Sequence, residues 1–324
     1  YQCDWSSDVC SSDLFGEAWS PKPVHYQRWR RRVKDAMYGA TLNAFARATG
    51  NLPTEAATGV GKSVGAFAYR CSRVEADRAR GNIARAFPGL TADDVDALAR
   101  ACFQHLGAAF VDVLRFDRLS ESTLDDVVDA RGLEVVREAL SRGCGCVVVT
   151  AHYGNWEMFG ATLALSGLNV VPVVRELRSR TLDRWVDGRR RMVGMTPASR
   201  QRSLRLAVEA LKANDVVLML PDVDTTGRGV FVDFFGKPAY TPVGPALLSA
   251  RYGAPLVTGF LTRRDGERHL AEIAEPIETR GDADADLLAT TTDITARIEA
   301  QIRRHPEQWI WMHRRWQTRP TDER

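Results

Sequence analysis

The stretch that decides the fold of this chain is CVVVTAHYGNWE, residues 146–157, in which a short β-branched run leads to His152 and Glu157. The run predicts a buried strand, and the residues after it predict the start of a helix. A histidine just past the end of a buried strand lies at the edge of the sheet, where it can meet a substrate. We interpret His152 as a general base and Glu157 as the carboxylate that orients it.

The spacing of these two residues is weak evidence by itself, because six histidines and 41 acidic residues produce such a pair by chance. The sequence around them adds weight, because strands and helices alternate. Strands are expected at 146–150, 170–174, 216–220, 230–234, 256–261 and 270–274, with helices at 133–140, 156–165, 182–192, 204–213, 245–252 and 287–304. This alternation predicts an α/β fold with a mainly parallel sheet flanked by helices, whose last strand is an antiparallel edge.

The region before the first predicted strand divides into two parts. Residues 1–29 are set aside, because Cys3–Leu14 can be back-translated into a common sequencing adapter. Without that segment the formal net charge rises from +3 to +6, since it contains three aspartates and no cation. Residues 30–130 are predicted to form a helical N-terminal region, and 131–320 to form the α/β core with its C-terminal helix.

Composition narrows the class of protein. A hydrophobic content of 44% and a charged content of 26% are ordinary for a globular protein. The cysteines outside the adapter-like segment show no disulfide framework, which fits a reducing compartment. Cys144 and Cys146 have no His/Cys cluster nearby, so we predict a turn entering a strand there and no metal site. No run of 18 apolar residues occurs, so no transmembrane helix is predicted.

A basic cluster, Arg28–Lys34, precedes an amphipathic stretch that runs to Phe45. Such a segment is typical either of a helix on an anionic membrane surface or of a solvated helix. Aromatic residues spaced to read bases are absent, so no nucleic acid is expected as a partner.

Residues 56–63, AATGVGKS, fit a relaxed phosphate-loop pattern. A phosphate loop has to follow a buried strand and open a helix. The preceding residues, GNLPTE, do not predict a strand, so nucleotide binding is not expected.

Three predicted strands end in residues that suit chemistry: His152, Arg175 and the pair Asp222 and Asp224. Ligands of parallel sheets bind outside the carboxyl ends of the strands, so these ends are expected to share one site. The Arg175 guanidinium suits a phosphate or a developing oxyanion, or is a surface cation. The aspartates would shape the loop or orient Arg175, with turn chemistry as the alternative. Two carboxylates without a third ligand do not predict a metal.

Two apolar segments remain open to two interpretations. Residues 230–241, VFVDFFGKPAYT, are either core or the lining of a channel for an alkyl chain. Trp309, Trp311 and Trp316, interleaved with basic residues, are either core or an interfacial belt.

An ordered set of segments resembles the lipid A biosynthesis (lauroyl/myristoyl) acyltransferase family of the lysophospholipid acyltransferase superfamily. The resemblance runs from about Arg32 to Pro320. It comprises RGNIARAFP (80–88), His152-x4-Glu157, Arg175, PDVD (221–224), GVFVDFFGKPAYTPVG (229–244), GAP (253–255) and PEQWIWMHRRW (306–316).

The resemblance implies a glycerolipid acyltransferase-like fold and transfer of a fatty acyl chain from a thioester to a hydroxyl of a lipid A precursor or related glycolipid. The implied donor is acyl-acyl carrier protein or acyl-CoA, without a cofactor. The implied location is the cytoplasmic face of the bacterial inner membrane, peripheral or monotopic. Many family members carry an N-terminal transmembrane helix, whereas this N-terminal segment is only weakly apolar. The alternatives are acylation of a phosphatidylinositol mannoside and a catalytically inactive lipid-binding homologue.

Overall fold

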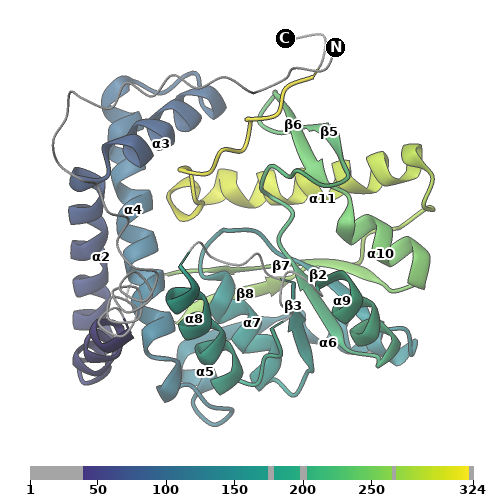
Figure 1. Cartoon of the computed structure of the whole chain (residues 1–324), viewed down its shortest axis with the longest axis horizontal. Coiled ribbons are helices and arrows are strands. Elements are labelled where there is room, and N and C mark those ends of the chain that lie inside the picture. The colour runs from purple at the N-terminus through teal and green to yellow at the C-terminus, as the bar shows by residue number, and fades with distance from the viewer. Residues whose placement is uncertain (1–38, 174–178, 198–202, 265–267, 321–324) are drawn as a thin grey trace, which may run out of the picture.

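A computed structural model describes residues 39–173, 179–197, 203–264 and 268–320. Its centre is a six-stranded sheet in the order β1-β8-β7-β2-β4-β3 (Figure 1). The strands are β1 Val128–Arg131, β2 Cys146–Val149, β3 Val170–Pro172, β4 Val216–Met219, β7 Leu256–Thr262 and β8 His269–Ile273.

Strand β2 lies inside the sheet, with β4 and β7 parallel to it on either side. Strand β3 continues the parallel arrangement beyond β4. The predicted mainly parallel α/β sheet is therefore confirmed. All four residues of β2 are buried, as expected for an apolar strand covered on both faces.

The other end of the sheet differs from the prediction. Strand β8 is antiparallel to β7, as predicted, but it is not the edge, because β1 pairs with it in parallel. The sequence pattern did not indicate β1. This strand is four residues long and contains Asp129 and Arg131, which form an ion pair with each other, so it lacks a continuous apolar run.

Helices cover both faces of the sheet. Cys146 and Val148 point into one apolar cluster, together with side chains of α6 Leu133–Ser141 and α7 Trp156–Leu165. Val147 and Val149 point into the other, with side chains of α9 Ser203–Lys212, α10 Gly244–Tyr252 and α11 Asp284–Arg304. Two further helices, α5 Leu124–Val127 and α8 Arg180–Met192, contribute Leu124 and Trp185 to the first cluster.

The N-terminal region is helical, as predicted. Residues 39–50 are followed by α2 Thr54–Cys71, α3 Arg73–Ala86, α4 Ala92–Leu114 and the short helix η1 Phe116–Arg118. Thr91 caps α4 in a capping box with Asp94. Figure 1 shows α2, α3 and α4 together at one side of the sheet.

The phosphate-loop-like residues 56–63 lie within α2 and follow no strand. Gly61 of this segment instead faces α4, and Gly65 and Gly107 lie at the same helix contact. A Cβ at Gly65 would lie 2.0 Å from the carbonyl oxygen of Phe103, and one at Gly107 of α4 would lie 2.1 Å from that of Gly61. Glycine at these positions lets the two backbones touch.

Helix α4 is the one described helix long and apolar enough to cross a membrane. Its apolar residues are used within the protein, where Ala99, Cys102 and Leu114 are fully buried. The apolar character of α4 is therefore that of a core helix.

A separate hairpin consists of β5 Gly229–Asp233 and β6 Pro238–Pro242, which packs on α11. The prediction of a strand at 230–234 was correct, but this strand is not part of the main sheet. Phe235 and Gly236 form the turn with positive φ values of 58° and 71°, which is the geometry that suits the twist of a two-residue hairpin. Glu299 of α11 accepts a hydrogen bond from the Phe235 amide at 2.6 Å.

The close contact of α2 and α4 predicts opposite effects for two glycine substitutions in α2. Gly65→Ala should lower the free energy of unfolding by about 1–3 kcal/mol, because the added methyl forces the helices apart. A Cβ at Gly59 would meet nothing within 4 Å. Gly59→Ala should therefore raise the free energy of unfolding by about 0.5–1 kcal/mol, since alanine favours the helix. Denaturant unfolding of the two variants measures both values; a stabilised Gly65→Ala would contradict the packing.

Candidate active site

His152 follows β2 by three residues and lies at the carboxyl edge of the sheet. Its backbone is fixed on both sides: the amide donates to Asp222 Oδ2 at 2.8 Å, and the carbonyl accepts from the Ile310 amide at 3.1 Å. Two residues later Gly154 has a φ of +58°, and a Cβ there would lie 1.7 Å from the Leu261 carbonyl oxygen. The chain turns sharply after the histidine because glycine allows this close approach.

The ring of His152 pairs with Asp222, which comes just after the neighbouring parallel strand β4. Nδ1 of His152 lies 2.9 Å from Oδ1 of Asp222, and the indole Nε1 of Trp309 donates to Oδ2 at 2.9 Å. The Asp222 side chain is fully buried, whereas that of His152 is 24% exposed. The two strand ends therefore meet, as the sequence predicted for these two positions.

The charge state of Asp222 follows from its surroundings. Burial by itself raises the pKa of this carboxyl, but His152 and the hydrogen bonds from His152 and Trp309 outweigh burial and hold the pKa well below its usual range. An ionised carboxylate can only accept, so Nδ1 of His152 carries the proton that the pair shares. Nε2 is then the unprotonated nitrogen of the neutral ring, which is the state a general base needs.

The structure corrects the expected partner of the histidine. Glu157, in the first turn of α7, forms a bidentate ion pair with Arg190 of α8, at 2.5 and 2.8 Å, and makes no bond to His152. The Nδ1 side of the imidazole is occupied by Asp222, and α7 directs Glu157 towards α8. Burial alone would lower the pKa of Arg190, but Glu157 and Asp187 raise it above its ordinary value. Asp222 therefore takes the orienting position predicted for Glu157.

The remaining predicted site residues have separate positions. Asp224 accepts hydrogen bonds from the Thr318 amide at 2.6 Å and from the Thr318 hydroxyl at 2.9 Å, so it holds the C-terminal segment. Its two carboxylate oxygens are thus engaged within the protein, which matches the loop-shaping alternative. Arg175 lies outside the described residues.

Two further aromatic rings enclose His152. The ring of Trp156 lies 5.1 Å from it and that of His313 lies 4.9 Å from it, both edge-to-face. Burial and the neighbouring His152 lower the pKa of His313 to about 4, so His313 is neutral near pH 7. The sequence reasoning had not assigned His313 to the site. The available signal was its place in the segment PEQWIWMHRRW.

This C-terminal segment is fixed by the N-terminal helices. Asn82 of α3 donates to the carbonyls of Trp311 and His313, both at 2.8 Å, and Cys102 of α4 donates to that of Trp309 at 2.9 Å. Trp309 and Trp311 are completely buried, so these two are core residues. Trp309 also belongs to the site through its bond to Asp222, which the sequence reasoning had missed.

A buried polar cluster supports the other side of the His152 loop. Asn155 caps α7 and donates to Asp112 Oδ2 of α4 at 2.9 Å, and Asp112 forms an ion pair with Arg263. His105 Nε2 lies 2.8 Å from the Gly154 carbonyl oxygen. Burial lowers the pKa of His105 to about 4, so it is neutral near pH 7 and acts as the donor to this carbonyl.

Within the described part of the chain, no three His, Cys, Asp or Glu residues are grouped to hold a metal ion. Cys144 and Cys146 are both free thiols. Burial raises the pKa of the Cys146 thiol to about 12, which makes it a poor metal ligand or nucleophile.

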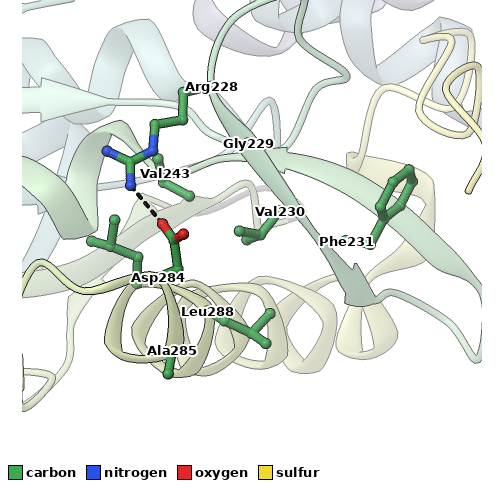
Figure 2. Close-up of a pocket in the computed structure, with 9 residues that line it drawn as sticks. Arg228, Gly229, Val230, Phe231, Val243, Asp284, Ala285 and Leu288 are labelled. Carbon is green, nitrogen blue, oxygen red and sulfur yellow. Dashed lines mark hydrogen bonds and ion pairs between the residues drawn. The ribbon is translucent and has the colours of Figure 1, made fainter.

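A pocket of about 520 Å³ lies away from His152, between the hairpin and the start of α11 (Figure 2). Val230, Phe231 and Leu288 line it, and Arg228 pairs with Asp284 across it at 2.7 Å. Residues 230–241 thus fall into two groups. Some, such as Val232 and Ala239, are core, while Val230 and Phe231 line the pocket. The pocket contains no residue of the His152 site.

Known proteins were compared with the chain. The family described as bacterial lipid A biosynthesis acyltransferase matches residues 28–318. A lipid A biosynthesis palmitoleoyltransferase of Escherichia coli K12 is 29% identical over 82% of this chain and 86% of its own length. A phosphatidylinositol mannoside acyltransferase of Mycobacterium tuberculosis is 28% identical over 74% of this chain and 77% of its own.

A crystal structure of the 1-acyl-sn-glycerophosphate acyltransferase of Thermotoga maritima aligns with 84% of this chain and 98% of that one. Its sequence identity is 13% and its TM-score 0.36, which is too low a likeness to bear on the fold.

The lowered pKa of His105 predicts an acid-sensitive fold. An unfolded histidine takes up a proton near pH 6.5, whereas His105 resists protonation until about pH 4. The unfolded state therefore binds more protons in this range, and His105 should cost about 3 kcal/mol of stability as pH falls from 6.5 to 4. His105→Gln should lose less stability over that interval. His305 is half-exposed, and His305→Gln is the control, whose free energy of unfolding should fall with pH as that of the parent does. If the free energy of unfolding of His105→Gln falls by the same amount as that of the parent, the assignment is wrong.

The buried ion pair predicts a structural role for Glu157. Glu157→Gln leaves Arg190 without its main counter-charge and should lower the free energy of unfolding by about 3 kcal/mol. Glu209→Gln removes the exposed pair with Arg205 and should cost about 0.5 kcal/mol or less. Urea unfolding curves of both variants test the difference, and equal losses would refute the buried role.

Proposed function

Because the chain belongs to the family of bacterial lipid A biosynthesis acyltransferases, we propose that it transfers a fatty acyl chain from a thioester to a hydroxyl of a lipid A precursor or related glycolipid. The observation that carries this proposal is the pair of His152 and Asp222 at two adjoining strand ends. It supplies an oriented imidazole that is partly open to solvent, which acyl transfer to an unactivated hydroxyl requires.

The proposed reaction needs no serine or cysteine nucleophile. Nε2 of His152 removes the proton of the acceptor hydroxyl as its oxygen attacks the thioester carbonyl. The carbonyl π bond becomes an oxyanion, and its collapse breaks the carbon–sulfur bond. The thiolate leaves with the proton held by the imidazolium, which returns His152 to its neutral form.

Asp222 makes this cycle easier in two ways. Its bond to Nδ1 keeps the ring in the tautomer whose Nε2 is free, and its negative charge stabilises the imidazolium that forms. Trp309 and the His152 amide hold the carboxylate in place. We propose Arg175 as a contact for the oxyanion or for a phosphate of a substrate.

The proposed acceptor is a glycolipid, and the proposed donor is acyl-acyl carrier protein or acyl-CoA, with no cofactor. Phosphatidylinositol mannoside is a second candidate acceptor, because an acyltransferase named for it is 28% identical. A catalytically inactive lipid-binding protein is a poorer proposal, since the His152–Asp222 pair has the geometry of a working base. Lipid mass spectrometry of cells with and without the gene distinguishes the two acceptors.

We also propose that the enzyme works at the cytoplasmic face of the bacterial inner membrane, as a peripheral or monotopic protein. The outer face of α2 supports this, because Val64 and Phe67 are 44% and 67% exposed there. Exposed apolar side chains of a helix can enter the interface of a bilayer. The predicted basic segment Arg28–Lys34 lies outside the described residues.

The roles of the three residues predict a graded series of activities. His152→Ala should abolish acyl transfer in a folded protein, and Asp222→Asn should lower kcat by about 10²–10⁴-fold, because the ring loses its tautomer and its charge partner. Glu157→Gln should keep most of the kcat at a temperature where it remains folded. Steady-state assays with circular dichroism as the folding control test the series. Near-normal turnover by His152→Ala would overturn the mechanism.

A further inference from the structure

Helix α8, Arg180–Met192, is strongly basic and unusually exposed. Its sequence RTLDRWVDGRRRM holds five arginines and two aspartates, and none of its residues is buried. The Ser179 hydroxyl caps its start by accepting a hydrogen bond from the Leu182 amide at 3.4 Å. Trp185 makes the apolar contact of this helix with the protein, against Phe110 of α4, and its other fixed contacts are polar ones.

One side of α8 is fixed to the active site. Arg190 binds Glu157 on α7, and the residue before Glu157 is Trp156, whose ring packs against His152. Arg189 stacks on Trp185 at 4.7 Å, and Trp185 donates to Asn43 at 3.1 Å. These bonds hold α8 in a defined position close to the catalytic histidine.

The other side of α8 carries an arginine face, formed by Arg180, Arg184, Gly188 and Arg191, which are all exposed. At 3.6 residues per turn these positions lie within an arc of about 80°, along about 16 Å of the helix. No carboxylate among the described residues forms an ion pair with these three arginines. Within the described part of the chain, the side chains of these arginines make one hydrogen bond, from Arg184 Nε to the Arg180 carbonyl oxygen at 3.2 Å.

Gly188 lies within the arginine face. A Cβ at this position would meet nothing within 4 Å, so helix packing does not require the glycine. Because Gly188 has no side chain and is exposed, the surface of a partner can approach the helix backbone at this position.

We infer that the arginine face of α8 docks an acidic protein, the carrier that delivers the acyl thioester. This inference rests on the proposed function, and it selects a protein-bound thioester over a free one. Guanidinium groups spaced along a helix match carboxylates spaced along a second helix. Because α8 is bonded to the residue beside Trp156, a carrier docked there lies close to His152.

The form of the surface favours an acidic protein over a bilayer or a single phosphate. Met192 is the one exposed apolar side chain of α8, whereas helices that enter a bilayer interface present an apolar face. Exposed apolar side chains occur instead on α2, at Val64 and Phe67. Three arginines spaced along about 16 Å of helix also form a longer surface than one phosphate group covers.

The test compares two donors with the same acyl chain, one on acyl carrier protein and one on CoA. In the triple variant Arg180→Glu, Arg184→Glu and Arg191→Glu, the KM for the carrier-bound donor should rise at least tenfold, with kcat at saturation unchanged. The KM for the CoA donor should change less than twofold. Raising the salt concentration should weaken the wild-type KM advantage of the carrier-bound donor, since exposed charge pairs are screened.

A matched control reverses three exposed arginines elsewhere, Arg142→Glu, Arg205→Glu and Arg251→Glu, which changes the net charge equally. This control should keep the parent KM for both donors. If its KM for the carrier-bound donor rises as much as that of the α8 variant, net charge alone explains the effect and the inference is overturned. If the triple variant of α8 unfolds, Arg184→Gln alone should still raise the KM for the carrier-bound donor, and an unchanged KM would overturn the inference.

Other outcomes overturn the docking site in distinguishable ways. An equal rise in KM for both donors would assign the arginines to a phosphate of the thioester. Unchanged KM values with lost binding to anionic vesicles would assign them to lipid. If the wild-type protein is active with acyl-CoA but not with the carrier-bound donor, the docking inference is wrong and the proposed acyltransferase activity is still supported. If it is inactive with both donors, the proposed function itself is wrong.

Discussion

The buried carboxylate of Asp222 is the group on which the rest of the site depends. It receives three hydrogen bonds, from the His152 amide, the His152 ring and the Trp309 indole. Each donor has a different place in the fold: the amide fixes the loop after β2, the ring is the proposed general base, and the indole belongs to the C-terminal segment. A buried charge without these donors would cost several kcal/mol. The folded chain therefore has to bring all three together.

This requirement explains why elements far apart in sequence converge on the site. The C-terminal segment that carries Trp309 is held by Asn82 of α3 and Cys102 of α4. The same α4 carries Asp112, which binds Asn155 beyond the histidine. The N-terminal helices thus form part of the candidate site, because they hold both the loop that bears His152 and the segment that bonds to Asp222.

The two acidic residues near His152, Asp222 and Glu157, have different partners because their surroundings differ. Asp222 emerges from a strand that is parallel to β2 and adjacent to it, so its side chain meets the imidazole directly. Glu157 emerges from the first turn of α7, where the nearest opposite charge is Arg190. The His-x4-Glu spacing therefore joins the proposed base to a residue that forms an ion pair with α8. The Glu157–Arg190 pair connects the His152 loop to α8, the helix that carries the exposed arginine face.

The sequence by itself determined the class of the fold and the place of His152 at a strand end. The short β-branched run 146–149 predicts a strand buried on both faces, and the helices between successive strands predict a mainly parallel sheet. The rule that parallel strands end at one edge then placed His152 and Asp222 together. These conclusions rest on local periodicity and on chain direction, both of which are written in the order of residues.

Tertiary structure alone decided which partner each side chain has. Whether Glu157 or Asp222 reaches Nδ1 depends on the direction in which α7 leaves the loop, and no local pattern encodes that direction. Trp309 and His313 join the site through contacts across more than 85 residues, which sequence spacing cannot indicate. The short strand β1 pairs with β8 although no apolar run in the sequence indicates it. Gly61 belongs to a segment that resembles a nucleotide motif, and only the packing of α2 against α4 shows its use. Pairing across space is set by the whole fold, whereas the sequence states only what each segment can do.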